Sequence, residues 1–99
     1  MIDYKLTKQA AKDLKDLRKQ YPDIGNKFLK LIGEVCEKGY DLPQTGKPEP
    51  LRENWSGYWS KRLTENDRII YKIMKALDDD GKAYDYVAVV SCKGHYGNK

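Results

Sequence analysis

The sequence predicts an α+β fold in which two helices near the N-terminus pack on one face of a twisted, mainly antiparallel sheet. Three observations lead to this prediction. Apolar residues recur at helical spacing up to Lys38 and at strand spacing in the second half of the chain. Pro22 and Gly39 punctuate the helical part. An Asp-rich segment with a glycine, residues 78–82, separates the last two apolar runs, so the predicted order of elements is β-α-α-β-β-β.

The two helices are predicted from their apolar stripes and their end signals. Residues 2–6 alternate as an edge strand would, and Thr7 suits the N-cap of the first helix. The apolar stripe of this helix consists of Ala10, Leu14, Leu17 and Tyr21. The second helix spans residues 23–38 and ends at Gly39, which suits the C′ position. Its buried face consists of Ile24, Phe28, Leu31, Ile32 and Val35.

The second half of the chain has the two-residue period of strands. Residues 68–74 place Ile69 and Tyr71 on one face and Arg68 on the other. Residues 83–92 alternate less cleanly, as suits a more central strand, and residues 78–82 form the hairpin turn between the two. With the helices on one face of the sheet, the other face is available for function.

Length and composition favour one compact domain that spans residues 1–99. The chain has 99 residues, of which 39% are hydrophobic and 34% charged, as in globular domains with little room for a large enclosed pocket. Nineteen Lys and Arg against fifteen Asp and Glu give a net charge of +4. This bias suits a nucleic acid or an acidic protein partner, but also a soluble lysine-rich surface, so the positions of the charges have to decide.

Composition also disfavours several classes of protein. Cys36 and Cys92 lie far apart without a CxxC pair, and the N-terminus has no signal-peptide pattern, which favours a cytoplasmic protein with two reduced thiols. No apolar run is long enough for a membrane-spanning helix, so no membrane contact is expected. One histidine and two scattered cysteines do not supply a zinc site, and no cofactor is expected.

Residues 46–71 combine an acid with several cations, a composition that suits phosphodiester chemistry. Glu49 lies between two prolines. The cations that follow it are Arg52, Lys61, Arg62 and Arg68. Each of these charges alone is compatible with a solvated surface, but together they provide a general base and phosphate-binding groups in one segment. The aromatic residues Trp55, Tyr58 and Trp59 are predicted to be core or hinge residues and not base-stacking platforms.

The same residues carry a resemblance to a known family. The matching motifs are GKPEPL at 46–51, Asn54, Ser56-Gly57, Trp59-Ser60, Arg62, RIIY at 68–71 and His95-Tyr96. From Gly46 to Tyr96 the chain resembles the YoeB/Txe toxins of the RelE/ParE-like superfamily, whereas the N-terminal helices match only in length and pattern. Members of that branch are toxins of bacterial type II toxin–antitoxin pairs, and they are ribosome-dependent endoribonucleases that cleave mRNA in the decoding site. The resemblance implies a RelE-like microbial RNase fold and a metal-independent mRNA interferase that inhibits translation.

The resemblance also implies a role for each matching residue. Glu49 is expected to be the general base and His95 the general acid. Arg68 is expected to stabilise the charge of the pentavalent phosphate. Tyr96 is expected to stack on a base or bond to a phosphate, and it could equally cap the core. The cations expected to position the RNA backbone are Lys47, Arg52, Lys61, Arg62 and Lys93.

The implied partners are a small antitoxin of the YefM/Axe kind, the bacterial ribosome and its mRNA. Operator DNA is expected to be bound only through the antitoxin complex, and a homodimer is left open. The basic face would attract an acidic or aromatic antitoxin tail. Two alternatives remain: a RelE/ParE-like toxin that inhibits a protein such as DNA gyrase without cleavage, and a catalytically silent RNA-binding module. The presence of Glu49, Arg68 and His95 favours the nuclease.

The sequence departs from the family pattern at four places. Residues 97–99 follow the His-Tyr pair, at which family chains commonly stop, so the contribution of a terminal tyrosine carboxylate is open. The last hairpin looks longer than usual, Trp55 stands where an aliphatic residue is common, and Lys61 replaces a frequent arginine. None of these changes removes the acid, the histidine or the arginine.

Overall fold

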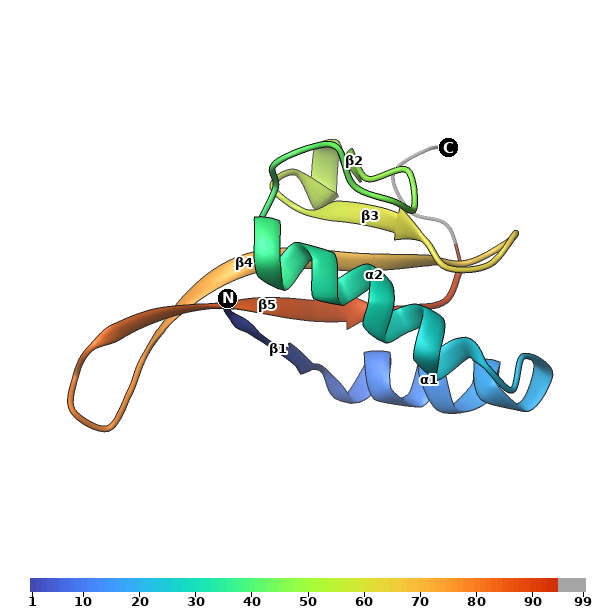
Figure 1. The fold of residues 1–99 in the computed structure, drawn as a ribbon, viewed down its shortest axis with the longest axis horizontal. Coiled ribbons are helices and arrows are strands. Elements are labelled where there is room, and N and C mark those ends of the chain that lie inside the picture. Colours follow the sequence, from blue (N-terminus) through green and yellow to red (C-terminus); the bar gives the residue numbers. More distant parts are fainter. Residues whose placement is uncertain (95–99) are drawn as a thin grey trace.

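Within residues 1–94, which the computed structural model describes, two helices lie on one face of a five-stranded sheet (Figure 1). The elements are β1 (Asp3–Leu6), α1 (Lys8–Gln20), α2 (Ile24–Lys38), β2 (Glu49–Pro50), the 3₁₀ turn η1 (Glu53–Trp55), β3 (Trp59–Arg62), β4 (Arg68–Leu77) and β5 (Ala83–Ser91). The strand order is β1-β5-β4-β3-β2, with β1 parallel to β5 and the other neighbours antiparallel. The predicted fold class is therefore confirmed, with β2 as an additional short strand.

The helices begin and end at the predicted signals. The Thr7 hydroxyl accepts a hydrogen bond from the Ala10 amide at 3.1 Å and so caps α1. Gly39 ends α2 with φ of 65°, a conformation that glycine adopts without steric cost. The prediction that Tyr21 belongs to the buried stripe is wrong, because Tyr21 lies past the last residue of α1 and is 38% exposed.

The core lies between the helices and the sheet. Its principal members are Leu14, Leu17, Phe28, Ile32, Val35, Ile69, Tyr71, Val87 and Val89. Burying a side chain of this size contributes about 1.5–3 kcal/mol, so this layer dominates the stability of the fold. Because side chains alternate along β4, Ile69 and Tyr71 face the helices and Arg68 faces the opposite side, as predicted.

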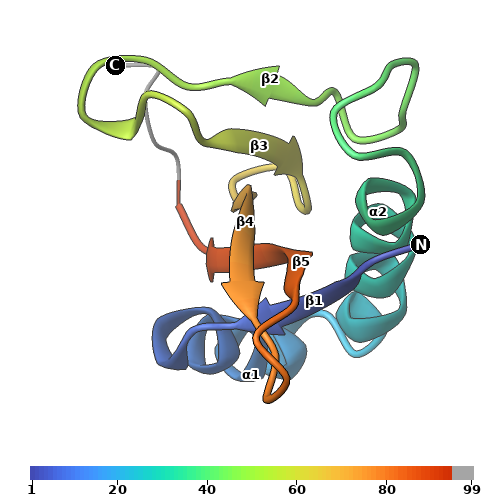
Figure 2. The same cartoon turned by 90° about the vertical axis from the view of Figure 1, so that its left-hand side faces the viewer.

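The β4–β5 hairpin extends beyond the helices as a twisted arm (Figures 1 and 2). Its tip is the predicted turn, in which the Asp78 amide donates to the Lys82 carbonyl at 2.9 Å. Figure 2 shows the β2–β3 end of the sheet on the opposite side of the molecule from β1 and α1.

Cys36 and Cys92 are both buried and free. In the part of the chain that the structure describes, no helix has the length and apolarity to cross a membrane.

Candidate active site

The short strand β2 places Glu49 beside Arg68. Glu49 lies opposite Ser60 of β3, and β3 pairs in turn with β4, so that Arg62 lies opposite Arg68. Through these two pairings the Glu49 Oε1 atom comes within 3.4 Å of Arg68 Nη2. The Glu49 side chain is 46% exposed and the Arg68 side chain only 5%. A solvent-accessible carboxylate therefore lies against a buried positive charge.

Hydrogen bonds hold the Arg68 guanidinium in place. Its Nε donates to Ser60 Oγ at 2.8 Å, and its Nη2 donates to the Lys47 carbonyl at 2.8 Å and to the Ser60 carbonyl at 3.2 Å. Burial lowers the pKa of Arg68, Glu49 raises it, and the nearby charge of Arg62 lowers it. An arginine remains ionised despite such shifts, because its ordinary pKa lies far above neutrality. Arg68 is thus a fixed cation in the wall of the site, more enclosed than the sequence indicated.

The end of the described chain reaches the same place. The Gly94 carbonyl accepts a hydrogen bond from the Arg68 amide at 3.1 Å, and the Gly94 amide donates to Asp67 Oδ1 at 2.9 Å. Asp67 therefore ties the segment after β5 to the turn before β4. His95 follows Gly94 in the sequence, but His95 and Tyr96 lie outside the described residues. Their roles stay predictions.

A buried carboxylate on α1 fixes the end of β5 from the other side. Asp13 is 4% exposed, and its Oδ2 accepts hydrogen bonds from the Cys92 amide at 3.0 Å and from Ser91 Oγ at 3.4 Å. No role had been predicted from the sequence for Asp13, Ser60 or Asp67. A signal for Asp13 was present, since it lies three residues after Ala10 on the buried side of α1, where a charge requires a partner.

Lys61 does not belong to the RNA-binding set that the sequence predicted. Its side chain is fully buried, and its Nζ donates to the Leu31 carbonyl at 2.9 Å and to Glu34 Oε1 at 3.0 Å. The physical reason is strand parity: Lys61 lies opposite Ile69 and shares the face that the helices cover. The prediction for Lys61 is wrong because an enclosed ammonium cannot meet a phosphate from solvent.

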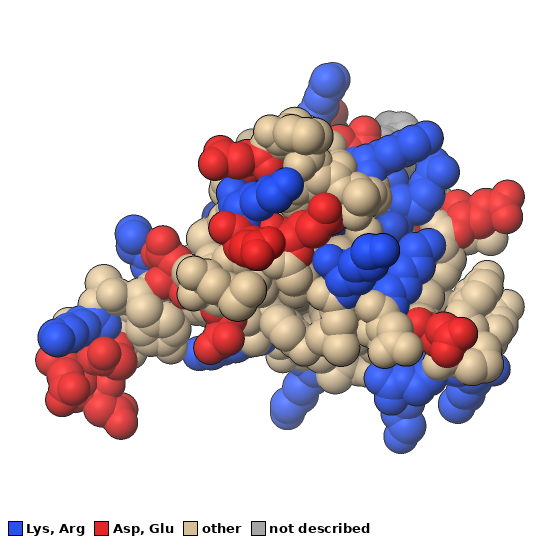
Figure 3. All heavy atoms as spheres, in the orientation of Figure 1, with Lys and Arg blue, Asp and Glu red and all other residues tan. Residues whose placement is uncertain are grey.

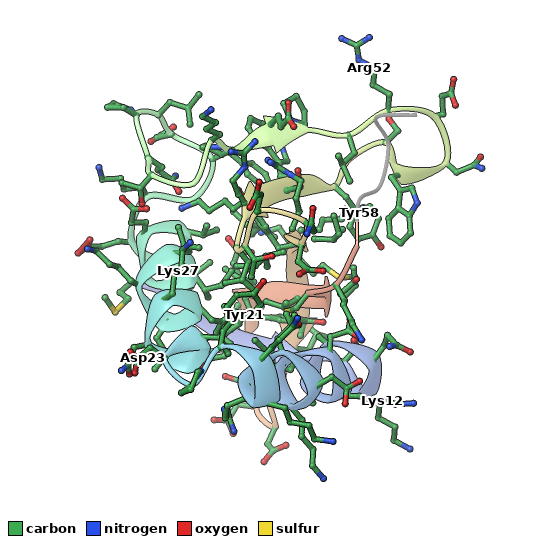
Figure 4. All side chains as sticks on the ribbon, turned by 90° about the vertical axis from the view of Figure 1, so that its right-hand side faces the viewer. Lys12, Tyr21, Asp23, Lys27, Arg52 and Tyr58 are labelled. Atoms are coloured by element: carbon green, nitrogen blue, oxygen red, sulfur yellow. The ribbon has the colours of Figure 1, made fainter. Side chains whose placement is uncertain are left out.

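The other predicted RNA-contacting cations are exposed. They are Lys47, Arg52, Arg62 and Lys93. Lys93 Nζ lies 3.8 Å from Asp16 Oδ2 on α1, and Arg52 points outward from the loop between β2 and β3 (Figure 4). Contact of these residues with RNA stays a prediction. Within residues 1–94, no three or more His, Cys, Asp or Glu side chains gather in a way that could hold a metal ion.

Of the three aromatic residues predicted to be core or hinge residues, Trp59 contacts the core, whereas Trp55 and Tyr58 are half-buried outside it. The Trp59 ring stacks on Tyr40 with centroids 5.2 Å apart and an interplanar angle of 14°, and Trp59 packs against the core. Trp55 and Tyr58 form an edge-on pair with centroids 5.3 Å apart beside η1.

Solved structures first identify the class of protein. The chain is similar to the YoeB dimer from Staphylococcus aureus, with a TM-score of 0.73, 28% identity and coverage of 96% of this chain and 98% of that chain. It is also similar to the heterotetrameric YoeB–YefM toxin–antitoxin complex from Staphylococcus aureus, with a TM-score of 0.71, 28% identity and coverage of 97% and 99%. The fold is thus that of RelE-like bacterial toxins.

Sequence comparison then gives the family. The profile of the YoeB-like toxin of bacterial type II toxin–antitoxin system matches residues 6–96. Toxin YoeB of Escherichia coli strain K12 is 43% identical over 78 residues, which cover 77% of this chain and 82% of that protein. The chain therefore belongs to the YoeB-like toxins of type II toxin–antitoxin systems. The predicted resemblance is confirmed, and it extends into the N-terminal helices, where the sequence had indicated only a match in length and pattern.

Proposed function

We propose that this toxin is an endoribonuclease that cleaves mRNA on the bacterial ribosome and thereby inhibits translation. The observation that carries the proposal is the pairing of an exposed carboxylate, Glu49, with the enclosed guanidinium of Arg68 at 3.4 Å. The hydrogen bond from the Arg68 amide to the Gly94 carbonyl adds support, because the histidine expected to be the general acid is the next residue in the chain.

The proposed reaction transfers two protons and exchanges one P–O bond for another. Glu49 takes the proton of a ribose 2′-OH, and the 2′-oxygen attacks the adjacent phosphorus. The bond from phosphorus to the 5′-oxygen breaks, and His95 protonates that oxygen, which leaves a 2′,3′-cyclic phosphate and a 5′-OH. General acid–base catalysis of this kind contributes about 10²–10⁴-fold, and the route requires no metal ion.

Arg68 would stabilise the negative charge that builds up on the phosphate in the transition state. Its bonds to Ser60 and to the Lys47 carbonyl support this role, because a preorganised cation does not have to be reoriented during the reaction. Tyr96 would hold a base or a phosphate. The RNA backbone would be positioned by Lys47, Arg52, Arg62 and Lys93.

The partners of the proposed enzyme follow from its relatives. Because a Staphylococcus aureus relative is seen with the antitoxin YefM, we expect a small antitoxin to cover the basic face of this toxin. Operator DNA would be contacted through that complex, and the other Staphylococcus aureus structure makes a homodimer a form to look for. We further expect residues 1–99 to act as one domain in the cytoplasm, with ribosome-bound mRNA as substrate.

The decisive variant is Glu49→Gln, assayed on mRNA in programmed bacterial ribosomes. The wild type is expected to produce fragments that end in a 2′,3′-cyclic phosphate, and Glu49→Gln to cleave at least about 100-fold more slowly. Lys12→Gln, an exposed change on α1, is the matched control and is expected to cleave like the wild type. Equal cleavage by Glu49→Gln would refute the role of this carboxylate. Absence of cleavage together with inhibition of DNA supercoiling would instead identify a gyrase-type target.

A further inference from the structure

A basic groove adjoins the candidate active site. It has a volume of about 410 Å³, and its cations are Lys27, Lys30, Lys47 and Arg62. None of the described residues that line it is acidic. No acid of residues 1–94 forms an ion pair with any of these four cations. The groove is thus lined by four cations, and no carboxylate of residues 1–94 lies within 4 Å of their charged nitrogens.

Three parts of the fold converge to build this groove. Lys27 and Lys30 lie three residues apart on α2 and so point to the same side of the helix. Arg62 ends β3, and its amide donates to the Gly46 carbonyl at 2.7 Å, which joins β3 to the segment before β2. Gly46 has φ of 84°, a conformation that favours glycine, and a Cβ atom there would lie 2.8 Å from Leu31 Cδ2 and 3.3 Å from Lys61 Cβ. The groove is therefore a built feature of the fold.

The charge distribution on the surface agrees with this geometry. Figure 3 shows Lys and Arg side chains gathered over α2, below the β2–β3 end of the molecule. Asp and Glu side chains gather at the tip of the β4–β5 hairpin and also over the C-terminal half of α2 (Figure 3). A polyanion is therefore drawn to the Lys and Arg cluster over the N-terminal half of α2 and not to the hairpin tip.

Two of the four cations connect the groove to the catalytic pair. The Lys47 carbonyl accepts the 2.8 Å hydrogen bond from Arg68 Nη2, so its backbone is part of the site while its side chain lines the groove. Arg62 lies opposite Arg68 in the sheet and is close enough for its charge to lower the pKa of Arg68. A strand held at Glu49 can continue directly into the groove.

We infer that the groove binds the sugar–phosphate backbone of the single-stranded RNA next to the cleaved bond, with Lys27 and Lys30 as its outer contacts. The inference rests on the proposed function and extends it, because it assigns RNA binding to two lysines of α2 that lie outside the motif segment. RNA is favoured over an acidic peptide because the groove continues the surface on which the reacting phosphate would lie. Lysines bind phosphates as point charges without sequence preference, so this contact is expected to be independent of base identity.

The test measures the binding of an RNA that cannot be cleaved, because its 2′-hydroxyls are methylated. The variant is Lys27→Gln/Lys30→Gln, and the matched control is Lys12→Gln/Lys15→Gln, which removes two exposed lysines of α1. Figure 4 shows Lys27 and Lys12 on different helices, well apart. Affinity is measured between about 50 and 200 mM salt for a dodecanucleotide and for a trinucleotide that covers only the catalytic pair. The melting temperature of each variant shows that it is folded.

The association constant of the dodecanucleotide falls as salt is added, and each lost phosphate contact is expected to make the slope of its logarithm against the logarithm of the salt concentration shallower by about 0.7. The slope for Lys27→Gln/Lys30→Gln should therefore be shallower than that of the wild type by about 1.4. Raising the salt about fourfold would then weaken the wild type roughly sevenfold more than the variant. The control variant should keep the slope of the wild type. The trinucleotide should bind equally to all three proteins, because it does not reach α2.

Three results would overturn the inference. The first is a salt dependence of RNA binding by Lys27→Gln/Lys30→Gln that equals that of the wild type. The second is a change in salt dependence of the same size in the control variant Lys12→Gln/Lys15→Gln. The third is a loss of binding to an acidic peptide with RNA binding intact, which would assign the groove to a protein partner. Because methylated RNA is not cut, the measurement is independent of catalysis. A toxin that shows the slope change but cleaves no mRNA would refute the proposed function and leave the groove assignment standing.

Discussion

Glu34 is the residue that keeps the buried ammonium of Lys61 in place. It pairs with Lys61 at 3.0 Å, and it also accepts hydrogen bonds from the amide and the hydroxyl of Thr45. Desolvation raises the pKa of Glu34, but the bonds from Thr45 and Lys61 outweigh this effect, so the pKa lies below its ordinary value of 4.5. One carboxylate thus joins α2, the segment before β2, and β3.

At neutral pH, Glu34→Gln is expected to destabilise the fold by about 1–3 kcal/mol, because it leaves Lys61 buried opposite a neutral amide. The difference from the wild type should shrink in acid. The depressed pKa means that the unfolded chain takes up the Glu34 proton first, so this contribution is present above pH 4.5 and is lost as the pH falls through the folded-state pKa. Urea unfolding of the wild type and of Glu34→Gln, at pH 6.5 and at lower pH, measures the two free energies of unfolding. If their difference stayed constant over this pH range, the ionised Glu34 would not be what stabilises the buried Lys61.

At the scale of elements, the turn between β3 and β4 holds the chain that follows β5. Asp67→Ala removes the acceptor of the Gly94 amide and is expected to lower single-turnover cleavage on the ribosome by about 10–100-fold, because Gly94 directly precedes His95, the proposed general acid. Asp67→Ala also removes the acceptor of the Thr64 hydroxyl, which donates to Asp67 Oδ2 at 2.7 Å, so its effect on stability should be about 1–3 kcal/mol, the value of two hydrogen bonds.

Asp67→Asn distinguishes positioning from a merely structural role. The amide oxygen of asparagine can still accept from Gly94, so cleavage should recover most of its rate. If both variants cleaved like the wild type, the tether to Asp67 would have no part in the reaction. If both lost activity in proportion to their melting temperatures, the effect would be one of stability alone.

The elements that the sequence predicted are those whose signals are local. Thr7 caps α1 and Gly39 ends α2 because capping involves only a few neighbouring residues. The contacts that escaped prediction join distant parts of the chain, as Asp13 does with Cys92. The burial of Lys61 was accessible from strand alternation, but its charge favoured a surface role. Glu49 and Arg68 were predicted from the motifs, and their contact depends on the register of three strands.

At the scale of the whole molecule, the Asp-rich tip of the β4–β5 hairpin lies far from the basic groove. The molecule measures 42 Å in its longest direction, with acidic residues at the tip of the β4–β5 hairpin and the basic groove on the body (Figures 1 and 3). The Debye length is about 8 Å at physiological salt and about 30 Å at 0.01 M. The two regions therefore interact through solvent only when the salt concentration is low.

Asp79→Asn/Asp80→Asn tests this separation, because both side chains are exposed while Asp78, which accepts hydrogen bonds within the turn, stays intact. The variant loses two negative charges, which raises the net charge by two from the present +4. It is expected to bind the methylated dodecanucleotide like the wild type at about 0.15 M salt and more tightly at about 0.01 M, where screening is weak. A gain of equal size at both salt concentrations would show that the hairpin tip contacts the RNA directly, and the proposed path of RNA along α2 would then be wrong.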